Sequence, residues 1–174
     1  FGMLYGLHGS YWKSIYDEKR SPVLVDALLA RGYEVRALTS ASWDFPEFRS
    51  TAWVRVEECA EDRLVSAREG ARDDGVAARF EEWLGARDAA RPFFAFLLLD
   101  APHQRYWFPP ESARFRPFPD EVTYMRIKDD APPELREGLY NRYRNAVAYA
   151  DDVLGRLLAA LAESGELAST VLVV

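Results

Sequence analysis

The sequence predicts an α/β fold, a three-layer α/β/α sandwich built on a mainly parallel β-sheet. Two short apolar runs, FFAFLLL at residues 93–99 and TVLVV at residues 170–174, have the length of strands. Unbroken apolar runs are typical of strands that are buried on both faces, as in parallel sheets between helices. Long segments with helical spacing of apolar residues lie before these runs, and alternating helices and strands of this length favour the layered architecture.

Composition sets bounds on the class of protein. The chain has 174 residues, of which 49% are hydrophobic, so it can form one domain with a real core. A net charge of −6 argues against nucleic acid as the main partner. The single cysteine, Cys59, excludes an internal disulfide, and no stretch has the length of a membrane span. Because the chain begins at Phe1 and stops inside an apolar run, we expect an incomplete fragment of a longer protein.

The N-terminal part predicts a loop followed by half of an α/β repeat. Residues 1–12 are rich in glycine and aromatic residues, which favours a loop or turn near other backbone. Ser21 is the expected N-cap of a helix whose first position is Pro22, and Gly32 is expected just past its end. Residues 33–38 then read as a short strand.

The middle of the chain predicts one weak strand and one clear helix. Residues 39–50 form a loop at the carboxyl end of the first strand, and residues 53–59 alternate weakly, as a strand would. Residues 57–74 are strongly charged, so we expect them to be exposed. Residues 75–90 form an amphipathic helix that leads into the apolar run 93–99.

The end of that apolar run is the most informative point of the sequence. The chain turns polar at Asp100, and Pro102 prevents regular strand pairing. His103 follows as the first imidazole beyond the strand, with Arg105 close behind it. In open α/β sheets, ligands bind beyond the carboxyl ends of the strands. We therefore expect His103 to face a ligand site.

The C-terminal part predicts a long loop, a long helix and a strand. Residues 104–133 have many prolines and little periodicity, as a loop would. A loop of this length is uncommon without a function. Residues 134–164 keep helical spacing of leucines, and Gly165 ends this helix. The β-branched run 170–174 is expected to be a buried parallel strand.

Three stretches together resemble one family. PFFAFLLLDAPHQRYWFP and YRNAVAYADDVLGRLLAALAESGELASTVLVV resemble segments of sulfatase-like enzymes of the alkaline phosphatase superfamily. The opening FGMLYGLHGSYWKSI resembles a narrower group, the periplasmic domain of YejM/PbgA-like inner-membrane proteins of Gram-negative bacteria. The resemblance implies that residues 1–174 are the central part of one sulfatase-like domain, truncated at both ends, at the periplasmic face of the inner membrane.

The resemblance also implies what the chain lacks. In the family, the nucleophile precedes the segment that begins here at Phe1, and an Asp-His-Gly metal-binding motif follows the position of Val174. The resemblance thus implies a divalent cation in the parent protein, and we expect no cation and no metal ligand in these 174 residues. Its implied partner is an anionic lipid or an ester substrate.

His103 resembles the family histidine that contacts the sulfate or phosphate group or the leaving-group oxygen. An imidazole can donate to an anionic oxygen and titrates near neutrality, which suits a catalytic role. The alternative is a histidine that only hydrogen-bonds its proline-rich loop.

Trp43 lies where relatives that resemble lipoteichoic acid synthase carry head-group contacts, so the resemblance implies a substrate-binding role. Arg105 and Arg49 could supply bidentate contacts to an anion. The alternative is a buried tryptophan and two solvated arginines.

Three further residues have structural interpretations. Asp151 and Asp152 are adjacent in a helix and do not share a face, so we expect Asp152 to cap or bond a nearby loop. Cys59 lacks the Cys-x-Pro-x-Arg context of the family's formylglycine cysteines, and we interpret it as a small apolar residue.

Two functions remain open on the sequence. The first is a metal-dependent hydrolase or phosphoglycerol transferase of sulfate or phosphate esters, inactive as these 174 residues alone. The second is a non-catalytic lipid-sensing or partner-binding domain of an inner-membrane protein in outer-membrane lipid homeostasis. We also expect that strand edges left open at runs 93–99 and 170–174 favour a homo-oligomer.

Overall fold

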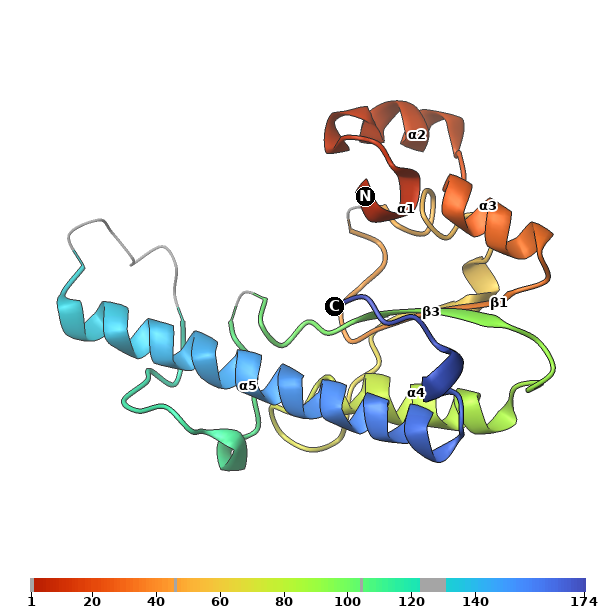
Figure 1. Ribbon diagram of the computed structural model, residues 1–174. Helices are drawn as coiled ribbons and strands as arrows, with labels where there is room; N and C mark the ends of the chain where they lie inside the picture. Colours follow the sequence, from red (N-terminus) through yellow and green to blue (C-terminus); the bar gives the residue numbers. More distant parts are fainter. Residues whose placement is uncertain (1, 46, 104, 123–130) are drawn as a thin grey trace. The chain divides into compact units, whose positions relative to one another are not determined.

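The computed structural model describes residues 2–45, 47–103, 105–122 and 131–174 (Figure 1). The chain divides into two compact units. The first comprises Phe1–Leu64 and Ala86–Leu98, and the second comprises Val65–Gly85 and Leu99–Val174. The first unit carries the sheet and the N-terminal helices, and the second carries most of the helical residues.

The sheet of the first unit is parallel and has three strands. They are β1 (Glu34–Thr39), β2 (Ala60–Glu61) and β3 (Phe93–Leu98), in the order β2-β1-β3. Every residue of β1 is paired with one of β3. This confirms the predicted α/β class with a parallel sheet. Association of two chains through truncated sheet edges stays a prediction.

The helix before β1 confirms the expected half repeat, with a different start. α3 (Val23–Ala30) has Pro22 as its N-cap, and the Pro22 carbonyl accepts from the Asp26 N–H at 3.0 Å. Gly32 follows the helix with a φ of +77°, a left-handed conformation that favours glycine. The Ser21 hydroxyl has no hydrogen-bond partner within the described residues, so it does not cap the helix as predicted.

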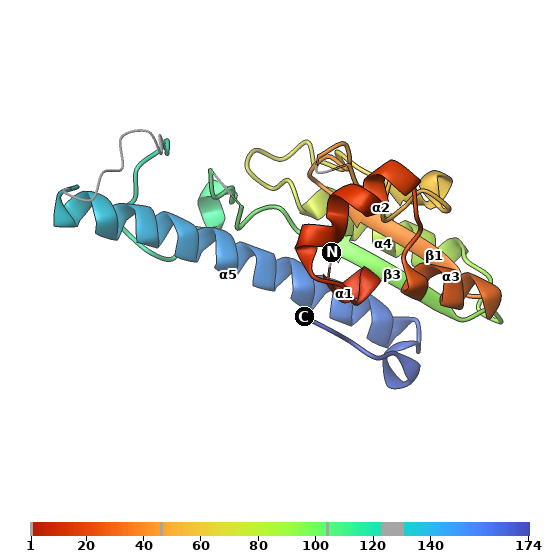
Figure 2. The same ribbon diagram turned by 90° about the horizontal axis from the view of Figure 1, so that it is seen from above.

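The prediction of a loop over residues 1–12 is wrong for the described part of that range. The chain there forms α1 (Gly2–Tyr5) and the 3-10 helix η1 (Gly9–Tyr11), which leads directly into α2 (Trp12–Glu18) (Figure 2). The Gly6 N–H donates to the Gly2 carbonyl at 2.7 Å, which closes a helical turn, and its φ of +67° then turns the chain out of α1. Glycine thus ends the helix rather than preventing it.

The weak strand predicted over residues 53–59 is also wrong. Turns occupy this range up to η2 (Glu57–Cys59), a 3-10 helix that precedes β2. The Val56 N–H donates to the Trp53 carbonyl and the Cys59 N–H donates to the Val56 carbonyl, each at 2.8 Å. Backbone donors that are used within local turns are not available for a ladder, and only Ala60–Glu61 pairs with β1.

β3 confirms the predicted strand at run 93–99 but not its complete burial. Each of its six residues is half-buried. The reason is its place in the sheet, since β1 covers one edge of β3 and no described strand covers the other.

Two helices dominate the second unit. α4 (Asp74–Ala86) and α5 (Pro133–Glu163) confirm the two predicted helices with small shifts at their ends. They lie side by side, joined by paired hydrogen bonds of 2.6 Å between Arg156 and Glu81. α5 ends before Gly165, whose φ is +79°. Within the described residues, no helix has the length and apolar character required to cross a bilayer.

The expected strand over residues 170–174 is not formed. The run follows the 3-10 helix η5 (Leu167–Ser169) and has no ladder partner among the described residues. Val171 and Val174 are exposed. A β-branched run needs a neighbouring strand to satisfy its backbone groups, and propensity alone does not supply one.

Residues 114 and 115 of the long segment 104–133 are bonded to α5. Gln104 and residues 123–130 lie outside the described residues. Between them, η3 (Pro110–Ser112) is followed by a stretch whose Arg114 and Phe115 N–H groups both donate to Asn145 Oδ1 at 2.8 Å. The buried Asn145 side chain therefore satisfies the backbone N–H groups of Arg114 and Phe115, as a partner in a helix or sheet would.

Candidate functional site

A buried carboxylate holds the polar turn that follows β3. Asp73 is fully buried, and its Oδ1 accepts from the Asp100 N–H at 3.0 Å while its Oδ2 accepts from the Ala101 N–H at 2.9 Å. A carboxylate taken out of water needs such donors, and bonds to a charged acceptor are stronger than neutral ones. Asp73 therefore fixes the backbone of the turn at its first two residues.

The same residue begins helix α4. The Asp73 carbonyl accepts from the N–H groups of Val76 and Ala77 at 3.0 and 3.2 Å. The prediction that residues 57–74 are exposed is therefore wrong at Asp73. The available signal was an aspartate directly before an apolar periodic run, which is an N-terminal helix signature.

Successive turns bring His103 to the surface. The His103 N–H donates to the Asp100 carbonyl at 2.9 Å, and the His103 carbonyl accepts from the Tyr106 N–H at 2.9 Å. The Trp107 N–H donates back to the Ala101 carbonyl at 3.0 Å, which closes the loop. The His103 side chain is 74% exposed, with its Nδ1 3.6 Å from Asp100 Oδ1. The imidazole is thus presented to solvent from a backbone that is held at its base.

Arg105 lies two residues further along the same turn, in an unusual conformation. Its φ is +85° and that of Tyr106 is +50°, although neither residue is glycine or asparagine. Left-handed backbone costs an ordinary residue roughly 1–2 kcal/mol, so the surroundings must hold it. One such hold is a hydrogen bond of 2.9 Å from Arg142 Nε to the Arg105 carbonyl. The Arg105 side chain is exposed.

A further basic side chain, that of Arg72, contacts the same turn. Arg72 Nη1 lies 3.7 Å from Asp100 Oδ2, and the Arg72 guanidinium lies 5.9 Å from the centre of the Trp107 ring. His103 and Arg105 thus belong to this turn, and Arg72 contacts it at Asp100 and Trp107. Imidazole and guanidinium groups in this arrangement can donate hydrogen bonds to an anionic oxygen.

Trp43 belongs to the core of the first unit. Its side chain is fully buried, and its Nε1 donates to the Glu61 carbonyl at 3.0 Å. The centres of its rings and those of Trp53 and Phe48 lie 5.6 and 5.4 Å apart. This geometry is that of the packing alternative, because no face of the indole is open to a substrate in the structure.

Arg49 forms ion pairs with Asp44 and Asp62, two carboxylates of the protein itself. Its Nε lies 3.2 Å from Asp44 Oδ1 and its Nη2 lies 3.0 Å from Asp62 Oδ1. The Asp62 Oδ2 also accepts from the Trp43 N–H at 2.9 Å. Arg49 therefore helps to fix the loop that carries Trp43.

The structural interpretation of Asp152 is confirmed. Both of its carboxylate oxygens accept from Arg114 Nη2, at 2.7 and 2.6 Å, so it bonds a nearby loop as expected. Asp151 is exposed on the same helix. The Cys59 thiol is free and half-buried.

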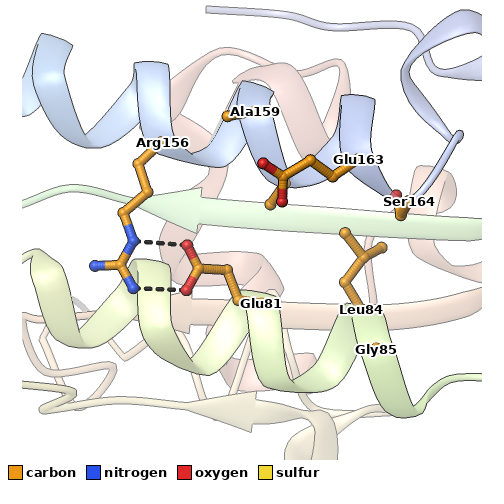
Figure 3. Close-up of a pocket in the computed structure, with 8 residues that line it drawn as sticks. Glu81, Leu84, Gly85, Arg156, Ala159, Glu163 and Ser164 are labelled. Carbon is orange, nitrogen blue, oxygen red and sulfur yellow. Dashed lines mark hydrogen bonds and ion pairs between the residues drawn. The ribbon is translucent and has the colours of Figure 1, made fainter.

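One groove of the second unit is not part of this turn. It has a volume of about 450 Å³ and lies between α4 and α5, and Figure 3 shows the paired bonds of Glu81 and Arg156 across it. The hydrogen bonds to Glu81 raise the pKa of Arg156, so both charges are used within the protein. The groove is therefore bridged by a structural ion pair.

The divalent cation that the resemblance implies would require several ligand side chains close together. Among residues 2–45, 47–103, 105–122 and 131–174, no three His, Cys, Asp or Glu side chains gather closely enough to hold a metal ion. The described residues do not fit such an ion.

The family model described as Sulfatase matches residues 2–174. The match includes both units and therefore includes the turn that carries His103 and Arg105.

Proposed function

Since the chain belongs to the sulfatase family, we propose that it forms part of a hydrolase domain for sulfate or phosphate esters, with the turn after β3 on the substrate side. The observation that carries the proposal is the buried Asp73 carboxylate, which fixes the base of a turn with His103 exposed on it. A hydrogen-bond donor on a fixed backbone needs little rearrangement to contact a negative charge on a substrate.

In this proposal, His103 donates to a non-bridging oxygen of the ester or protonates the leaving-group oxygen, and Arg105 neutralises the anion. Both side chains are exposed, so a substrate can reach them without rearrangement of a core. The proposal assigns no step to a divalent cation, because the described residues offer no ligand set for one.

The finer form of the proposal follows the YejM/PbgA-like resemblance. The substrate class is then an anionic lipid head group at the periplasmic face of the inner membrane, and the reaction is phosphoglycerol transfer. We expect the 174-residue chain by itself to show no turnover. The resemblance assigns neither the family's nucleophile nor its cation ligands to residues of the matching stretches.

The second candidate function is a non-catalytic lipid-sensing or partner-binding domain. One observation favours it, namely a group of exposed aromatic and apolar side chains on α1, η1 and α2. The two functions share the fold, and fold alone does not decide between them.

Anion binding at His103 tests the substrate-side role directly. The chain has two histidines, so His8 is an internal control. In a titration of the chain with phenyl phosphate, we expect the imidazole nitrogen signals of His103 to shift to saturation and those of His8 to stay. Nuclear magnetic resonance of the ¹⁵N-labelled chain measures both.

The same titration assigns the role of Arg105. Arg105→Ala should weaken binding about three- to tenfold, because one charged contact to the anion is lost. Arg31→Ala removes another exposed arginine and should leave the affinity unchanged. Equal shifts of the two histidines, or no shift of either, would contradict the proposal.

A further inference from the structure

One peptide unit of the turn after β3, the one that joins Arg105 to Tyr106, is hydrogen-bonded on both sides. Its carbonyl accepts from Arg142 Nε at 2.9 Å, and its N–H donates to the His103 carbonyl at 2.9 Å. Because a peptide unit is planar, these two bonds together fix one orientation of it. We call this unit the 105–106 peptide. It connects the backbone of His103 to helix α5.

The orientation of the 105–106 peptide is one that the local sequence does not favour. It requires a φ of +85° at Arg105 and of +50° at Tyr106, which glycine adopts readily and other residues do not. A rotation of the peptide plane would return Tyr106 to a negative φ, and it would break both hydrogen bonds. A bond from a charged donor is stronger than a neutral one, so the Arg142 guanidinium can offset the local preference.

The Arg142 guanidinium is itself held in place. Its Nη1 donates to the Pro119 carbonyl at 2.9 Å, and its centre lies 5.4 Å from the centre of the Phe108 ring. Phe108 is buried, and the Phe118 ring packs against it at 5.3 Å, centre to centre. The donors of a guanidinium form a rigid planar fork, so a bond to one acceptor aims the donor for the other. Arg142 therefore reaches the 105–106 peptide from a fixed position.

The backbone of this turn directs the two side chains that are proposed to contact the anion. The His103 side chain is 74% exposed and the Arg105 side chain is also exposed, so their direction depends mainly on the backbone that carries them. Asp73 fixes that backbone before His103, at Asp100 and Ala101. The bond from α5 fixes it after His103, at the 105–106 peptide.

We propose that Arg142 is a positioning residue of the anion site, which acts by holding the 105–106 peptide and does not touch the anion. The inference rests on the proposed function, since it concerns the same His103 and Arg105 contacts. Donors that are already in place bind an anion more tightly than donors that must first be ordered. Loss of Arg142 therefore weakens anion binding, although both contacting side chains remain.

Amide hydrogen exchange tests the hold on the peptide without any ligand. In Arg142→Ala, we expect the Tyr106 N–H to exchange at least about tenfold faster than in the wild-type chain, because its bond to the His103 carbonyl opens when the peptide rotates. The Trp107 N–H bonds elsewhere in the turn and should keep its wild-type exchange rate.

Two further variants separate the geometry of Arg142 from its charge and from general support of the loop. Arg142→Lys keeps the positive charge but replaces the planar fork with an ammonium, so the Tyr106 N–H should again exchange faster. Arg114→Ala is the matched control, because Arg114 also ties the segment to α5, through Asp152. Its loss should leave the exchange of the Tyr106 N–H unchanged.

Titration with phenyl phosphate, followed at the imidazole nitrogen signals of His103, tests the consequence for binding. Arg142→Ala should weaken binding about three- to tenfold, as Arg105→Ala does. Adding Tyr106→Gly to Arg142→Ala should restore the affinity to within about twofold of the wild type, because glycine adopts the left-handed conformation without a hold. Glycine at this position cannot replace a lost contact between Arg142 and the anion.

Unchanged exchange of the Tyr106 N–H in Arg142→Ala would overturn the proposal. So would weakened binding that Tyr106→Gly fails to restore, because Arg142 would then contact the anion itself. If Arg142→Ala does not fold, Arg142→Lys serves for both measurements. Failure of the ester proposal has a separate signature, in which phenyl phosphate leaves the His103 signals of the wild-type chain unchanged. That result would remove the anion role of Arg142 as well, while the exchange rates would still show whether it holds the peptide.

Discussion

Replacing Asp73 with alanine should lower the free energy of unfolding by about 2–4 kcal/mol, because two backbone donors lose their shared acceptor. The Asp100 and Ala101 N–H groups bond to opposite oxygens of this carboxylate. The second of these bonds is buried, so water does not readily replace the lost partner. Urea unfolding followed by circular dichroism measures the change, and amide hydrogen exchange at Asp100 and Ala101 locates it.

Two matched variants separate this effect from the loss of a charge. Asp151→Ala removes an exposed carboxylate from α5 and should change stability by less than about 0.5 kcal/mol. Asp73→Asn keeps one acceptor oxygen and should fall between the wild type and Asp73→Ala. A loss below about 1 kcal/mol for Asp73→Ala would show that the turn is held by other contacts.

Replacing Trp43 with alanine should cost about 3–5 kcal/mol, the range for truncation of a large buried aromatic side chain. Its ring packs among Phe48, Trp53 and Phe96 in the core of the first unit. The change also removes the donor that satisfies the Glu61 carbonyl. The same urea unfolding experiment measures the loss.

Phe45→Ala is the control for Trp43→Ala. Phe45 belongs to the same loop and is 81% exposed, so its truncation should leave stability within about 0.5 kcal/mol of the wild type. Unchanged stability of Trp43→Ala would contradict the packing role of Trp43.

Local chemistry was sufficient to predict β3 and the turn beyond it. An apolar run of strand length, a polar residue and a proline determine where the chain leaves the sheet, and these are neighbours in sequence. The long helix α5 was predictable for the same reason, because its apolar spacing and Gly165 lie within one segment.

Contacts between distant segments were not predictable in this way. Asp73 bonds a residue 27 positions away, and an aspartate in a charged stretch looks the same whether it is solvated or buried. Trp43 likewise follows a strand, where an aromatic residue can face either a ligand or the core. The run 170–174 has strand propensity, but strand formation also depends on a neighbour that propensity does not encode.

The left-handed conformation of Arg105 and Tyr106 gave no sequence signal either. Glycine or asparagine normally marks such positions, and here the surrounding contacts impose the conformation. Their positions two and three residues after His103 place an imposed backbone geometry beside the proposed anion contacts, where strain is often kept for function.

The most direct test is the rate at which the complete gene product hydrolyses p-nitrophenyl sulfate and p-nitrophenyl phosphate in the presence of divalent cations. We predict measurable turnover that His103→Ala lowers by about 10²- to 10⁴-fold in kcat, the range for loss of a general acid, while His8→Ala has no effect. Turnover by His103→Ala at the wild-type rate would contradict the substrate-side role of this turn. Complete absence of turnover in the wild type would contradict the hydrolase proposal and favour the lipid-sensing function.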